Sequence, residues 1–141
     1  MPRLLKALPL AFMLSCGGQK HVEKGLEFRN WFVVKPVAGA TGSVAYGQIK
    51  NTSAERMTLA KADFNCAGST ELHETITADG RARMVPLGEI GLDPGGSVIF
   101  EPGHKHIMLM RLKETGENCA AVFTFSQTTV QFNVPVKARE K

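Results

Sequence analysis

Short runs of alternating apolar and polar residues follow one another along most of the chain, with turn residues between them. The runs cover residues 28–34, 43–50, 57–65, 70–77, 81–87, 97–100, 106–112, 120–126 and 130–134. Gly, Pro, Asn and Asp separate them, as in Asp79-Gly80 and Asp93-Pro94-Gly95-Gly96. Strands spaced about 8–12 residues apart, without a helical period of 3.6, predict an antiparallel β-sandwich or barrel. We therefore expect one all-β domain over residues 27–136.

The first fifteen residues follow a different pattern. Arg3 and Lys6 precede the apolar stretch 7–14, and Ser15-Cys16 follows it. A basic start and a short apolar core predict a signal peptide over residues 1–15. A small residue before a Cys resembles the bacterial lipobox, although Met13 stands where that motif usually has Leu. We predict lipidation of Cys16 and a bacterial membrane anchor outside the cytoplasm; the alternative is a plain signal peptide with an incidental Cys.

Composition limits the remaining function classes. With 141 residues and 43% apolar positions, the chain holds one globular domain. Cleavage before Cys16 removes two basic residues and no acid, so the formal net charge falls from +4 to +2. That small excess predicts no nucleic-acid partner. We expect a monomer with a polar tether over 16–26 and a solvated tail over 137–141.

Cys66 and Cys119 are the two cysteines that follow the predicted anchor. An even number of cysteines in an exported protein favours a disulfide, which here would join residues 53 positions apart. The alternative is a pair of free thiols that bind a soft metal ion.

Histidine and methionine residues form two pairs that strand geometry places on common faces. His106 and Met108 lie two positions apart, so on a strand they share one face, while Ile107 points to the other. Asp79-Gly80 predicts a two-residue hairpin turn, in whose register Thr75 lies opposite Met84. His73 is then a diagonal neighbour of Met84 on the same face. If the two strand elements meet, they form a site of two imidazoles and two thioethers.

This set of ligands is selective for copper(I). Thioether sulfur is soft and uncharged, which suits Cu(I) and disfavours Zn²⁺, Ca²⁺ and Mg²⁺. We predict His73, Met84, His106 and Met108 as ligands of one Cu(I) ion per chain. Met110 shares the parity of Met108 and is a reserve ligand or, alternatively, a packed side chain.

The spacing of these four residues resembles the metal motif of the PCu(A)C family of periplasmic copper(I) chaperones. Ten residues separate His73 from Met84, and twenty-one separate Met84 from His106-Ile107-Met108. The flanking segments Glu71-Leu72-His73-Glu74 and Pro102-Gly103-His104-Lys105 are also similar to that family. The resemblance implies a cupredoxin-like Greek-key β-sandwich that delivers Cu(I) to the dinuclear copper A centre of cytochrome c oxidase. It further implies an acceptor such as an oxidase subunit or a Sco-type thiol protein.

Other functions predict different residues. An electron-transfer cupredoxin requires a Cys thiolate beside two His, and no His or Met follows Cys119 closely. We found no nucleophile elbow, phosphate loop, zinc-protease motif or Cys-x-x-Cys, so we expect no enzyme activity. The alternatives that remain are a non-metal interaction lipoprotein on the same sandwich and a copper-sequestering protein.

Overall fold

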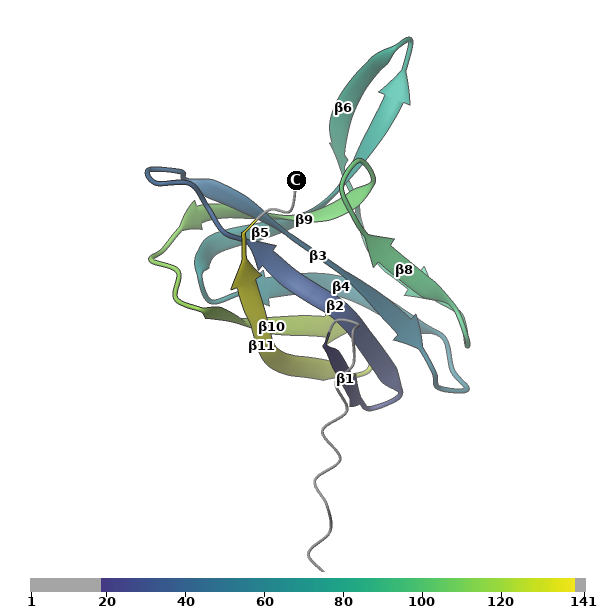
Figure 1. The fold of residues 1–141 in the computed structure, drawn as a ribbon. Helices are drawn as coiled ribbons and strands as arrows, with labels where there is room; N and C mark the ends of the chain where they lie inside the picture. The colour runs from purple at the N-terminus through teal and green to yellow at the C-terminus, as the bar shows by residue number, and fades with distance from the viewer. Residues whose placement is uncertain (1–18, 139–141) are drawn as a thin grey trace, which may run out of the picture.

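The computed structural model describes residues 19–138, and this part of the chain is built from β-strands (Figure 1). The strands are β1 (Lys20–Glu23), β2 (Leu26–Val34), β3 (Gly42–Asn51), β4 (Met57–Phe64), β5 (Ala67–Ala78), β6 (Arg81–Pro86), β7 (Ile90–Leu92), β8 (Ser97–Phe100), β9 (Lys105–Leu112), β10 (Asn118–Phe125) and β11 (Thr129–Lys137). The all-β class predicted from the alternating pattern is confirmed.

The strands form two layers that share β11. In the first layer β6 pairs with β5, β5 with β9, β9 with β3, β3 with β2 and β2 with β1, while β8 lies beside the second half of β3. The second layer has the order β11, β10, β4, β7. Residues 129–135 of β11 pair with β10, and 136–137 pair with β2, so this strand passes from one layer to the other.

Large apolar side chains from both layers fill the space between them. Phe123 on β10 is fully buried, and its ring lies 4.8 Å from that of Trp31 and 5.0 Å from that of Phe28, measured between centroids. The indole of Trp31 covers Gly47, where an added Cβ would come within 2.1 Å of the ring, so this position requires glycine. The Trp31 Nε1–H donates to the carbonyl of Gln48 at 3.0 Å, which satisfies its polar atom.

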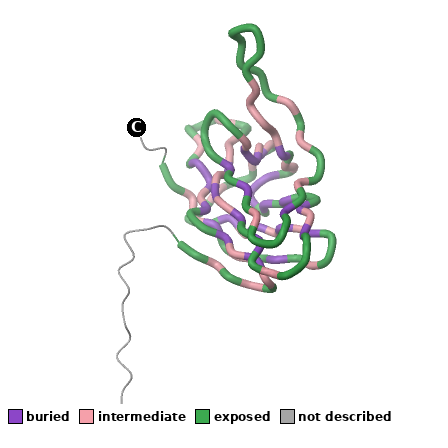
Figure 2. Tube along the Cα trace, turned by 90° about the vertical axis from the view of Figure 1, so that its right-hand side faces the viewer, coloured by how far each residue is buried: buried purple, intermediate pink, exposed green. Residues whose placement is uncertain are grey.

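The hairpin of β5 and β6 extends beyond the sandwich (Figure 1). Asp79 and Gly80 have φ angles of 54° and 74°, the left-handed values that a two-residue hairpin turn requires. Thr75 lies opposite Met84, which confirms the register predicted from the turn. Every residue from 77 to 84 is exposed, so neither face of the outer hairpin packs against the sandwich (Figure 2).

The domain begins earlier than the sequence pattern predicted. Residues 20–23 were expected in a solvated tether, but they form β1 and pair with β2. Leu26, also assigned to the tether, is fully buried, and His21 stacks on Phe132 with ring centroids 4.6 Å apart. Four residues of mixed polarity carry no clear strand signal, so the prediction of a tether through residue 26 is wrong. The short β7 was also not predicted.

Cys66, in the turn before β5, and Cys119 on β10 form a disulfide, with Cα atoms 5.6 Å apart. Both cysteines are buried. Cys16 and the predicted signal peptide lie outside the described residues. Within residues 19–138, no helix has the length and apolar character needed to cross a membrane.

Candidate metal centre

Pairing of β5 with β9 places two histidines side by side. His73 lies directly opposite His106 in the antiparallel register, and the two ring centroids are 5.7 Å apart. Leu72 and Ile107, next to them in sequence, point into the core and are buried. Because side chains alternate along a strand, both imidazoles therefore lie on the outer face of the first layer.

The two predicted methionine ligands flank this pair on the same face. Met108 is two positions beyond His106 on β9, lies opposite Glu71 and is partly buried. Met84 is on β6, diagonal to His73, and is 57% exposed. The strands β6, β5 and β9 are neighbours, so all four predicted residues share one face of three adjacent strands. Met110 lies one step further along β9, opposite Ser69, and is partly buried.

Each histidine has one ring nitrogen with a partner and one without. The Nε2–H of His73 donates to the Glu71 carboxylate at 2.7 Å, whereas the Nδ1 atom is buried without a hydrogen-bond partner. For His106 the roles are reversed. Its Nδ1–H donates to the carbonyl of His104 at 3.1 Å, and Nε2 is buried without a partner.

Two buried unpartnered nitrogens on neighbouring rings, one ring edge-on to the other, fit a metal ion. Buried polar atoms almost always have a partner, so two orphaned atoms on one face require an explanation. A metal-binding histidine typically donates its other ring N–H to a carboxylate or carbonyl, which leaves the remaining nitrogen free to coordinate. His73 and His106 both have this arrangement. Within residues 19–138, no group of three or more His, Cys, Asp or Glu side chains could hold a metal ion.

The other charged and imidazole groups nearby lie apart from this pair. Glu74 follows His73 on β5 but points to the opposite face, where it pairs with Lys105 at 2.9 Å. The exposed side chain of His104 lies 3.9 Å from Glu101. The sequence pattern assigned Glu71 no role at the centre. Its position two residues before His73 on a strand was the signal that could have identified it.

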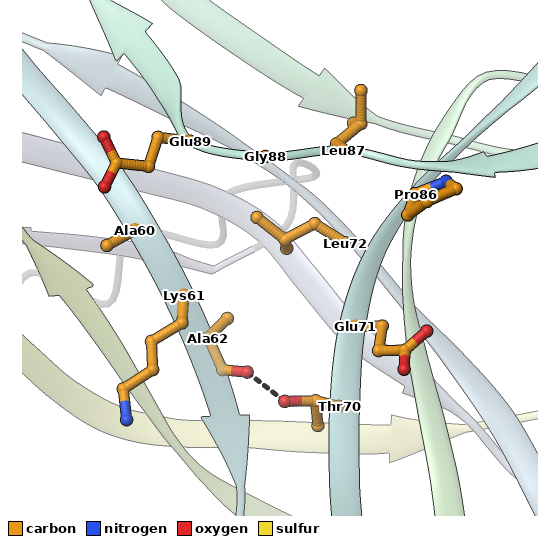
Figure 3. Close-up of a pocket in the computed structure, with 10 residues that line it drawn as sticks. All are labelled: Ala60, Lys61, Ala62, Thr70, Glu71, Leu72, Pro86, Leu87, Gly88 and Glu89. Atoms are coloured by element: carbon orange, nitrogen blue, oxygen red, sulfur yellow. Dashed lines mark hydrogen bonds between the residues drawn. The ribbon is translucent and has the colours of Figure 1, made fainter.

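A pocket of about 270 Å³ lies beside the candidate centre, between β4 and the segment that follows β6. Figure 3 shows Leu72 and Glu71 pointing in opposite directions from β5, and the Thr70 hydroxyl donating to the carbonyl of Ala62. Glu71 lines this pocket and also contacts His73, whereas none of the four predicted ligands lines it.

Comparison with solved structures shows that the fold is that of copper-handling domains. The chain is similar to the copper-bound PCuAC domain of PmoF2, with a TM-score of 0.71 and 17% identity over 86% of this chain and 99% of that domain. It is also similar to apo-DR1885 from Deinococcus radiodurans, with a TM-score of 0.63 and 20% identity over 99% of this chain and 95% of that one. Cu(I)-bound DR1885 has a TM-score of 0.55 and 24% identity over 77% of this chain and 75% of that one.

A curated sequence relative comes from Leifsonia xyli subsp. xyli. This protein, named "Putative lipoprotein Lxx21020", is 36% identical over 105 aligned positions, and the match covers 71% of this chain. The match covers 63% of the relative, so this chain spans less than two thirds of that protein. A family model described as "Putative lipoprotein LpqE-like" matches residues 26–136. The chain therefore belongs to the LpqE-like lipoprotein family, and its cupredoxin-like all-β fold is that of PCuAC copper chaperone domains.

Proposed function

We propose that this protein binds one Cu(I) ion outside the cytoplasm and carries it to a copper enzyme. The observation that carries the proposal is the pair of buried, orphaned nitrogens, Nδ1 of His73 and Nε2 of His106, on neighbouring rings that meet edge to face. Met108 and Met84 flank these rings and would supply soft thioether sulfur. Nitrogen and thioether donors without a thiolate or carboxylate favour Cu(I) over harder divalent ions.

The exposure of Met84 favours a carrier over a copper store. Three of the proposed ligands lie on β5 and β9 and are at least partly buried, but the Met84 side chain stands at the edge strand and is 57% exposed. An acceptor can approach from this side and replace one thioether, so Cu(I) would pass by exchange of ligands. Electron transfer is less well supported, because Cys66 and Cys119 form a disulfide and neither supplies a thiolate.

The comparisons support the same proposal. The PmoF2 domain is described as copper-bound and the DR1885 structure as a Cu(I) form, and both share the fold of this chain. Membership of a lipoprotein family supports lipidation at Cys16 and a membrane-anchored location outside the cytoplasm. The acceptor that we propose is the copper A centre of cytochrome c oxidase, reached directly or with a Sco-type protein.

An anaerobic Cu(I) titration of the full chain in detergent, against a chromogenic competitor, tests the binding site. We expect one tight site, with nitrogen and sulfur neighbours in the X-ray absorption spectrum. His106→Ala and Met108→Ala should each weaken binding, and His106→Ala by more than about 100-fold, because removing a ligand exceeds the 10–100-fold cost of losing a group that only orients one.

His104→Ala is the matched control, because His104 contributes only its backbone carbonyl to the centre while its side chain is exposed. This variant should bind Cu(I) like the wild type. A folded wild-type chain that does not compete for Cu(I) would contradict the proposal and favour a non-metal interaction lipoprotein. Wild-type affinity in both His106→Ala and Met108→Ala would refute the assignment of ligands.

A further inference from the structure

Glu71 holds the imidazole of His73 from the side opposite to its free nitrogen. The carboxylate oxygen Oε2 accepts the hydrogen bond of His73 Nε2–H at 2.7 Å, within the range of a strong charge-assisted bond. The His73 side chain is 16% exposed, so water has little access to replace this partner. The bond fixes both the ring plane and the tautomer, and it leaves the lone pair on Nδ1.

The two histidines obtain this orientation from different sources. His106 donates to the backbone carbonyl of His104, and the same carbonyl accepts the backbone N–H of Thr75 at 3.0 Å. That acceptor is part of the strand framework and no side-chain substitution removes it. His73, in contrast, depends on a side chain that is itself 55% exposed.

Strand geometry explains why Glu71 reaches the centre and Glu74 does not. Glu71 and His73 are two positions apart on β5, so they share the outer face, and Glu71 also lies opposite Met108. Glu74 lies on the other face and forms its ion pair with Lys105. Of these two carboxylates on one strand, Glu71 therefore lies beside the metal centre, and Glu74, three positions further on, lies on the opposite face.

We propose that Glu71 is a positioning residue of the copper centre: it fixes His73 in the Nε2–H tautomer, so that His73 binds Cu(I) through Nδ1 while His106 binds through Nε2. The part of this inference that concerns Cu(I) binding rests on the proposed function. The tautomer of His73 is a property of the metal-free protein and can be measured separately.

The first experiment measures Cu(I) affinity of the full chain by competition in three variants. Glu71→Ala removes the acceptor and should weaken binding by about 10–100-fold, the usual effect of losing a partner that orients a ligand. Glu71→Gln keeps an oxygen acceptor but loses the charge, so its affinity should lie between Glu71→Ala and wild type. Glu74→Gln is the matched control on the same strand and should bind like the wild type.

The second experiment records ¹⁵N NMR shifts of the imidazoles in the metal-free full chain at pH 8. Wild type should show His73 protonated at Nε2 and His106 protonated at Nδ1. In Glu71→Ala the His73 signals should shift toward a mixture of tautomers, while those of His106 stay unchanged. A general loss of packing would move both histidines, so this readout separates positioning from a structural role.

Three outcomes would overturn the inference. They are wild-type Cu(I) affinity in Glu71→Ala, equal weakening by Glu71→Ala and Glu74→Gln, and an unchanged His73 tautomer in Glu71→Ala. Failure of the wild type to bind Cu(I) would instead contradict the proposed function, and the NMR result would still decide whether Glu71 orients His73.

Discussion

The sandwich and the outer β5–β6 hairpin use the same antiparallel pairing, but they differ in what supports it. In the sandwich, Phe123 on β10 and Ile107 on β9 are fully buried between two layers. In the hairpin, every residue from 77 to 84 is exposed, although Thr77 lies opposite Ala82 in a regular register. Hydrogen bonds between two strands alone give marginal stability in water, so the hairpin depends on its turn and the sandwich on its core.

The candidate centre lies at the boundary between these two regions. His73 and His106 stand on paired strands of the supported sheet, whereas Met84 stands on the unsupported edge strand. We therefore expect the two halves of the centre to respond differently to substitution. Changes in the sandwich should lower the free energy of unfolding, and changes in the hairpin should alter copper binding with little effect on unfolding.

The largest expected effect is loss of the disulfide, tested in the double variant Cys66→Ala and Cys119→Ala. The bond closes a loop of 53 residues, and its removal should lower the free energy of unfolding by about 2–4 kcal/mol. Denaturant unfolding of the full chain measures this change. Cu(I) affinity measured below the unfolding transition should stay within about twofold. A stable double variant with weakened Cu(I) binding would contradict the separation of the two regions.

The fold and the hairpin could be predicted from local signals. Alternating residues and turn dipeptides identified nine strands, and Asp79-Gly80 fixed the pairing of Thr75 with Met84, because a two-residue turn leaves a single register. β1 and β7 lacked such signals. Lys20–Glu23 is mostly polar and becomes a strand because its neighbour β2 offers a free edge.

The facing histidines depend on a pairing that no local signal determines. His73 and His106 are opposite each other because β5 pairs with β9, although more than thirty positions of sequence separate the two histidines. The sequence predicted which face each side chain occupies, but not that the two strands are neighbours. The contacts of Glu71 with His73 and of the His104 carbonyl with His106 are local, each between residues two positions apart, but which ring nitrogen they hold depends on the ring orientations.

A smaller effect is expected from Met84→Ala, which tests the exposed half of the centre. Because Met84 is 57% exposed and contributes little to packing, the free energy of unfolding should change by less than about 0.5 kcal/mol. Cu(I) affinity should fall on the order of tenfold, equal to about 1.4 kcal/mol, which is less than for His106→Ala. Competition titrations of both variants make the comparison. A larger loss of Cu(I) affinity in Met84→Ala than in His106→Ala would contradict the expectation that His106 contributes more to the centre than the exposed Met84.

The smallest effect is expected from Gly80→Ala in the hairpin turn. Gly80 has a φ of 74°, where an L side chain costs about 1 kcal/mol, and no neighbouring atom lies within 4 Å of an added Cβ. The strain therefore acts on the backbone of the hairpin alone, and by loosening β6 it should weaken Cu(I) binding by at most about fivefold.

Gly95→Ala is the control for this turn, because Gly95 has a φ of 81°, equally open surroundings and a position between β7 and β8. It should introduce the same backbone strain and leave Cu(I) affinity unchanged. If both glycine variants bind Cu(I) equally well, the conformation of the turn does not control Met84. The exposed hairpin would then be only a support for the thioether, and the ligands on β5 and β9 alone would set the affinity of the centre.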